Sequence, residues 1–134
     1  MKTFVLLGAL LLAGCASSAH DVYAPVRNVD YSAISHDPFW LVSVGDDKIV
    51  LTMGPAGGNA DGELITTEFP RVLAKTLSDG ARRWKSSDGK ATITLEARRG
   101  RCTAGGRTYA DRTIVRLNGR EYKGCGGPET NGAS

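Results

Sequence analysis

Few residues of this 134-residue chain have the types and spacing of an active site. Its two histidines, His20 and His36, stand alone, and neither a Gly-x-Ser-x-Gly nor a His-x-x-x-His motif is present. The carboxylates Asp46 and Asp47 follow a glycine between two apolar runs, which is typical of a hairpin turn, and one turn offers too few oxygens to hold a metal ion. We therefore expect no enzyme activity, no cofactor and no metal site.

The first cysteine ends a segment that is typical of an export signal. Lys2 precedes an apolar run over residues 4–12, which is too short for a membrane-spanning helix of roughly 20 residues. Leu12-Ala13-Gly14-Cys15 resembles the lipobox of bacterial lipoproteins, and the resemblance implies cleavage before Cys15 and its acylation, for example by palmitate. Ala16, in place of Asp, favours the outer membrane, facing the periplasm. An ordinary secretory signal with an incidental cysteine is the alternative.

The other two cysteines, Cys102 and Cys125, form an even pair in a chain that we expect to be exported. Because the periplasm is oxidising, such a pair favours a disulfide, which would stabilise the fold by roughly 3 kcal/mol in the chain-entropy model. A metal site and a reactive thiol are the alternatives, but no histidine follows His36 and no Cys-x-x-Cys motif occurs. We expect a disulfide between Cys102 and Cys125.

Basic side chains are concentrated in the second half of the chain. Residues 16–79 carry 4 basic and 9 acidic side chains, whereas residues 80–125 carry 12 basic and 4 acidic ones. Such a cluster attracts anions, so we expect an anionic envelope component or a protein as partner, with Arg98-Arg99-Gly100-Arg101 as the densest group. A solvated exterior that discourages aggregation is the alternative. Without aromatic residues interleaved among the basic ones, nucleic acid is not expected.

A segment after Cys102 suggests a more specific alternative function. Membrane-bound inhibitors of c-type lysozyme are also small disulfide-bridged β-barrel lipoproteins, and one of their loops enters the acidic cleft of the enzyme. Gly106-Arg107-Thr108-Tyr109-Ala110 is similar to such a loop, and the resemblance implies that Arg107 meets the catalytic carboxylates while Tyr109 belongs to the same binding segment. An ordinary connection held by the disulfide is the alternative.

Three β-hairpins are predicted to position these groups. Their strands are rich in β-branched and aromatic residues and their turns contain Gly, Asp, Ser or Asn. In the last hairpin Asn118-Gly119 favours a type I′ turn, which places apolar residues inward and an Arg116–Glu121 ion pair outward, worth at most about 1 kcal/mol. The strand pairs are 39–44 with 48–53, 81–85 with 91–98, and 113–117 with 120–123, the last pairing Leu117 with Arg120, Arg116 with Glu121 and Val115 with Tyr122.

The remaining segments are less regular. Residues 64–69 predict a strand that ends at Pro70, residues 72–77 fit a strand or a helical turn equally well, and residues 54–62 predict a loop. Four large aromatic residues are expected to fill the core rather than to bind an apolar ligand in a barrel. They are Phe39, Trp40, Trp84 and Tyr122.

Together these elements predict an all-β domain, either a small antiparallel β-barrel or a sandwich with one disulfide. Residues 16–37 show no sustained period, which is typical of a flexible tether. We expect a signal peptide over residues 1–14, a lipidated N-terminus and tether over 15–36, the β-domain over 37–127 and a disordered tail over 128–134.

Two features carry a resemblance to a known family. Pro38-Phe39-Trp40 leads into a hairpin, and the second C-terminal cysteine lies in Tyr122-Lys123-Gly124-Cys125-Gly126-Gly127. Over roughly residues 36–127 the chain resembles a family of small, mostly uncharacterised bacterial lipoproteins, although Thr103–Tyr109 replaces the acidic, Met-containing stretch usual there. The resemblance implies compartment, disulfide and fold class. The sequence thus predicts a membrane-anchored, non-enzymatic binding or envelope-maintenance module, with inhibition of c-type lysozyme as the alternative.

Overall fold

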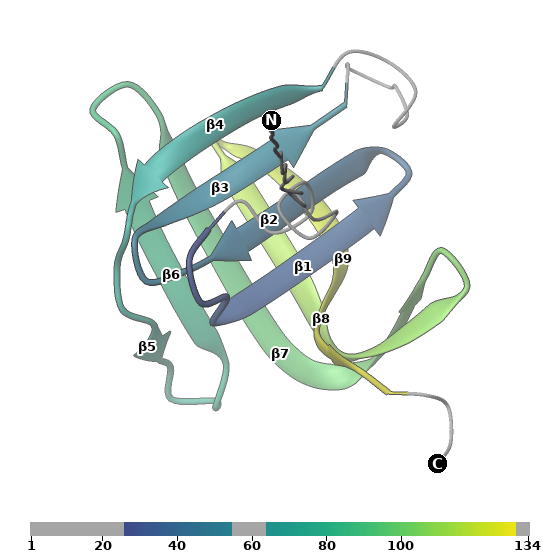
Figure 1. The fold of residues 1–134 in the computed structure, drawn as a ribbon. Helices are drawn as coiled ribbons and strands as arrows, with labels where there is room; N and C mark the ends of the chain where they lie inside the picture. The colour runs from purple at the N-terminus through teal and green to yellow at the C-terminus, as the bar shows by residue number, and fades with distance from the viewer. Residues whose placement is uncertain (1–25, 55–63, 131–134) are drawn as a thin grey trace, which may run out of the picture.

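The computed structural model describes residues 26–54 and 64–130, which form one curled antiparallel sheet shaped like half a barrel (Figure 1). The described residues contain no helix, and thus none that could cross a membrane. The predicted all-β antiparallel fold is confirmed. The sheet has the order β4-β3-β2-β1-β9-β8-β7-β6-β5. Its strands are β1 (Tyr31–His36), β2 (Phe39–Val44), β3 (Lys48–Met53), β4 (Ile65–Pro70), β5 (Lys75–Thr76), β6 (Arg82–Ser87), β7 (Thr92–Ala104), β8 (Arg107–Leu117) and β9 (Arg120–Glu129).

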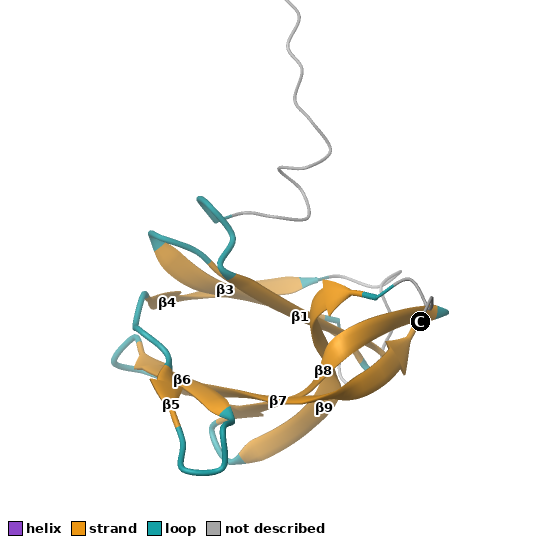
Figure 2. Cartoon of the chain, turned by 90° about the horizontal axis from the view of Figure 1, so that it is seen from below, coloured by secondary structure: helices purple, strands orange, loops and turns teal. Residues whose placement is uncertain are grey.

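The core lies between the two halves of the curled sheet. Figure 2 shows β1, β3 and β4 on one side of the molecule and β5, β6, β7 and β9 on the other. Trp40 and Trp84 are fully buried between them and Tyr122 packs against the same core, as predicted, whereas Phe39 is only half-buried and lies outside the cluster. Near the open edge, Ser86 Oγ donates a hydrogen bond of 2.6 Å to the Pro70 carbonyl and so links β6 to β4.

All three predicted hairpins are present, as β2–β3, β6–β7 and β8–β9. In the last one Asn118 and Gly119 have φ values of 51° and 88°, as a type I′ turn requires. The three predicted cross-strand pairs are all observed, and Arg116 lies 3.0 Å from Glu121. Turn chemistry therefore fixed this register, as expected.

The domain is longer at both ends than predicted. Residues 31–36, assigned to the tether, form β1 between β2 and β9, and Pro128 and Glu129, assigned to the tail, continue β9. The tether prediction failed because the inward residues of β1 include Ala33 and Ser35, while the apolar Ile34 lies on the less buried side of the strand. Small residues at inward positions hide the usual alternation.

A further hairpin, β7–β8, replaces the connection predicted after Cys102. β7 continues to Ala104, and Gly105 and Gly106, with φ values of 59° and 78°, form a two-residue turn into β8. The Cys102–Cys125 disulfide is confirmed and joins β7 to β9. Residues 72–77 contribute only the short strand β5. The predicted signal, the lipidation site Cys15 and most of the 54–62 loop lie outside the described residues.

Candidate functional site

A basic cleft lies at one open end of the half-barrel. Its volume is about 540 Å³, within the range of small-molecule sites. Three arginines, from β6 and β7, and one buried carboxylate, from β8, contribute its charged groups, and tyrosine and proline side chains add apolar surface. We call this the mouth cleft; it is lined by Arg82, Arg99, Gly100, Arg101, Tyr109, Ala110, Asp111, Pro128 and Thr130.

The buried carboxylate is Asp111, which is only 7% exposed. Tyr31 Oη donates a hydrogen bond of 2.8 Å to its Oδ2 atom. Burial, and then this hydrogen bond, raise the pKa of the Tyr31 phenol above its ordinary value, so the phenol stays protonated and keeps donating at neutral pH. A Cβ atom on Gly127 would lie 2.6 Å from the same Oδ2 atom, which explains why β9 has glycine beside Asp111.

Arg82 is held over the core by aromatic rings. Its guanidinium carbon lies 5.0 Å from the Tyr31 ring centroid and 5.3 Å from the Trp84 centroid, both within cation–π distance. The two rings are themselves stacked, with centroids 4.9 Å apart. Arg82 Nη2 lies 3.7 Å from Asp111 Oδ2. Rings and carboxylate together fix the guanidinium plane, and its remaining donors are available to the cleft.

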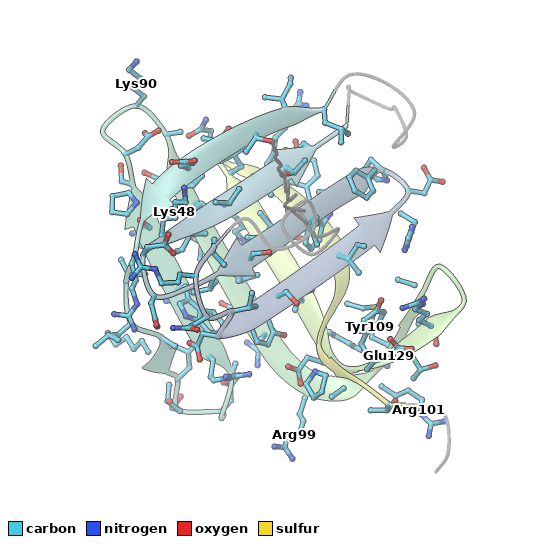
Figure 3. The ribbon with its side chains drawn as sticks, viewed as in Figure 1. Lys48, Lys90, Arg99, Arg101, Tyr109 and Glu129 are labelled. Carbon is cyan, nitrogen blue, oxygen red and sulfur yellow. A yellow bond between two sulfur atoms is a disulfide. The ribbon has the colours of Figure 1, made fainter. Side chains whose placement is uncertain are left out.

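Arg99 and Arg101 come from the bent part of β7. The β7–β8 register shifts between Arg99 and Cys102, and Arg112 Nε donates to the Arg101 carbonyl at 3.4 Å, which supports the irregular backbone. Figure 3 shows Arg101 near Tyr109 at the hairpin end, Arg99 projecting from the same border of the sheet, and Lys48 and Lys90 well away from it. Neither Arg99 nor Arg101 forms an ion pair with a carboxylate among residues 26–54 and 64–130.

The predicted binding residues therefore separate into two groups. Arg99, Arg101 and Tyr109 line the mouth cleft together. Arg98 does not, because it forms ion pairs with Asp79 and with Glu96, and Arg107 is 3.3 Å from Glu129. The prediction of a loop over Gly106–Ala110 is wrong, because the last four of these residues belong to β8.

Sequence reasoning missed Arg82 and Asp111 as members of the site. In the cleft Arg82 lies over the ring of Tyr31, which β1 brings next to Trp84, a contact between strands that are distant in the sequence. No apolar run surrounds Asp111 in the sequence, so its neighbours do not indicate that it is buried. A lone acidic residue between Arg107 and Arg112 was the one available signal.

The residues considered for catalysis lie elsewhere. His36 is exposed at the end of β1, and the Asp47 carboxylate accepts a hydrogen bond of 2.9 Å from the Arg27 backbone, which lowers the pKa of that carboxyl. Asp46 accepts one from Asn28 at 2.8 Å. Both residues lie in the turn between β2 and β3, as predicted, and their carboxylates join this turn to the segment before β1. No group of three His, Cys, Asp or Glu side chains in the described part of the chain could hold a metal ion.

Fold and site together define a small disulfide-bridged β half-barrel with a basic cleft at its mouth. No protein-family model, no curated protein and no solved structure matches this chain.

Proposed function

We propose that the protein is a membrane-anchored periplasmic lipoprotein that acts as a non-enzymatic binding module, and that the mouth cleft binds an anionic group of its ligand. The anchor rests on the lipobox-like segment ending at Cys15, and the outer-membrane location on Ala16. The binding function rests on the charge of the mouth cleft.

The mouth cleft has an excess of positive charge around one buried carboxylate. Arg82, Arg99 and Arg101 line the cleft, and among the described residues Asp111 is the only acidic one that lines it. The Asp111 carboxylate already accepts from Tyr31 and faces Arg82, so it orients the arginine rather than neutralising all three. Phosphate and carboxylate groups form charge-assisted, often bidentate bonds with guanidinium groups, which makes them the fitting ligands.

The size of the cleft indicates that the ligand is more than a free ion. A cleft of about 540 Å³ leaves room for an organic body beside the anionic group, and Tyr109, Ala110 and Pro128 provide surface for it. Binding without chemistry is the function that this lining supports, because the lining residues in the described part of the chain include no nucleophile paired with a base.

Calorimetric titration of the full chain, carrying Cys15→Ser to prevent acylation, tests the proposal. Glucose 6-phosphate and glucuronate are the anionic probes and glucose the neutral one. We expect both anions to bind and glucose not to bind, and we expect Arg99→Ala with Arg101→Ala to weaken binding at least tenfold, since each charge-assisted bond contributes about 1.5–3 kcal/mol. Equal heats for glucose and the anions contradict the proposal.

A control variant separates the cleft from overall charge. Lys48→Ala with Lys90→Ala removes the same two charges from exposed or half-buried positions outside the cleft. Binding of the anionic probes should change less than threefold in this variant, because exposed charges further away than a Debye length of about 8–10 Å are screened. A loss equal to that of the arginine variant would mean that net charge, not the cleft, attracts the probes.

Inhibition of c-type lysozyme is a second candidate, and one observation favours it. One register shift lies in the β7–β8 pairing and another in the β8–β9 pairing near the end of this hairpin, and Arg107 stands beside its glycine turn with a side chain that is 67% exposed. Glu129 must release Arg107 before it can enter an acidic cleft. Inhibition of lytic rate that is lost in Arg107→Ala and strengthened in Glu129→Ala would support this function, and undiminished lysis at micromolar protein would remove it.

A further inference from the structure

A second basic surface covers the outer side of the sheet, opposite the core. The strand register places Arg83, Glu96, Ile114 and Lys123 in one row across β6, β7, β8 and β9. The adjacent row, Trp84, Leu95, Val115 and Tyr122, points inward to the core, so the first row points outward. We call this surface the outer basic face; its basic residues are Arg83, Lys85, Arg98, Arg112, Arg116 and Lys123.

Glu96 organises the centre of the outer basic face. Its side chain is 7% exposed and lies 3.2 Å from Arg83, 3.3 Å from Arg98 and 3.8 Å from Arg116. One buried carboxylate therefore holds three guanidinium groups around itself and leaves an excess of positive charge. Asp79, which pairs with Arg98, and Glu121, which pairs with Arg116, complete the acidic groups that contact these arginines in the described structure.

The remaining basic side chains carry the unbalanced charge. Lys85, Arg112 and Lys123 are exposed and form no ion pair with a carboxylate among the described residues. The outer basic face thus has six basic groups, and three acidic groups pair with them. A hollow of about 380 Å³ lies in this surface, lined by Glu96, Arg98, Cys102, Arg112, Thr113, Ile114, Lys123 and Gly124.

We propose that the outer basic face binds the surface of an anionic phospholipid bilayer. Basic groups spread over four strands can each contact a lipid phosphate, and each contributes about 1 kcal/mol of attraction near such a surface. A protein partner is the less fitting occupant, because protein interfaces centre on buried aromatic or apolar anchors. The exposed large apolar residues of the described chain lie elsewhere, at Val29, Leu64, Ile65 and Leu73.

Vesicle sedimentation tests this proposal independently of the mouth cleft. The full chain carrying Cys15→Ser is mixed with vesicles of phosphatidylcholine alone or of phosphatidylcholine with phosphatidylglycerol, and the ratio of the two partition coefficients is measured. This ratio cancels the apolar contribution of the N-terminal segment, and the charge of Lys2 is common to all the variants that are compared. We expect preference for the anionic vesicles, decreasing with added salt. Equal partitioning into both vesicles would overturn the proposal.

Paired variants locate the contact. Lys85→Ala with Lys123→Ala should reduce the ratio about thirtyfold, because each lysine contributes about 1 kcal/mol of attraction to the anionic surface. Lys48→Ala with Lys90→Ala, with the same net charge, should reduce it less than threefold. Equal losses in both variants would overturn the outer basic face as the contact surface. Binding to soluble polyglutamate but not to anionic vesicles would likewise overturn it in favour of an acidic protein partner.

Discussion

Replacement of Tyr31 by phenylalanine removes one oxygen atom and isolates the hydrogen bond that organises the mouth cleft. The ring remains, so its stacking on Trp84 at 4.9 Å and its contact with the Arg82 guanidinium are preserved. What disappears is the bond of 2.8 Å to Asp111. The buried carboxylate then keeps Arg82, 3.7 Å away, as its one side-chain partner among the described residues. A hydrogen bond to a charged group contributes about 1.5–3 kcal/mol, so we expect a loss of about 2 kcal/mol in the free energy of unfolding at pH 7.

Urea unfolding followed by tryptophan fluorescence measures this loss with the disulfide intact. The slope of the free energy against urea should not change, because the variant exposes the same surface on unfolding. Tyr122→Phe is the matched control: Tyr122 is half-buried, donates no hydrogen bond to the described residues, and should cost less than about 0.5 kcal/mol. Equal costs for the two variants would refute the argument that Asp111 depends on Tyr31.

Three further predictions concern the same fold. Burial and the bond to Asp111 raise the pKa of Tyr31 in the folded state. As the pH rises above about 10, where the unfolded phenol ionises, the free energy of unfolding of the wild type should therefore fall by about 1.4 kcal/mol per pH unit relative to Tyr31→Phe. Urea titrations at each pH measure this difference, which should not change below about pH 10. The disulfide closes a loop with a sequence separation of 23. The variant with Cys102→Ser and Cys125→Ser should therefore lose about 3 kcal/mol in the free energy of unfolding by the same assay. Gly127→Ala should lower the free energy of unfolding by at least about 1 kcal/mol more than Gly106→Ala. Both glycines have a φ of 78°, but only at Gly127 would a Cβ atom meet Asp111, at 2.6 Å. Equal melting temperatures for the two variants would contradict this.

The parts of the fold that local chemistry determines were predictable. Asn118-Gly119 selects a turn with two positive φ values, and the register of β8–β9 followed from it. Gly105-Gly106 carries the same type of signal, and reading it as a turn would have revealed the β7–β8 hairpin. β1 was not predicted, for a different reason. It pairs with β2 on one side and β9 on the other, and its small inward residues give little of the alternation of apolar and polar residues that indicates a strand.

The candidate site was predictable only in part. Charge density indicated Arg99 and Arg101, but it also indicated Arg98, which the strand directs to the outer face beside Glu96. Which of several consecutive arginines shares a cleft depends on strand face and on the bulge in β7, neither of which the run itself specifies. The family resemblance and the lipid anchor stay predictions.

The most direct test of the central claim, that the mouth cleft binds an anionic group, is residue-resolved NMR titration of the full chain carrying Cys15→Ser with glucose 6-phosphate. We predict saturable shifts of the amide and guanidinium signals of Arg99 and Arg101 and of the amide of Tyr109, with signals of β3 and β4 unchanged. Shifts confined to other strands, or linear shifts spread over all basic residues, would contradict the account.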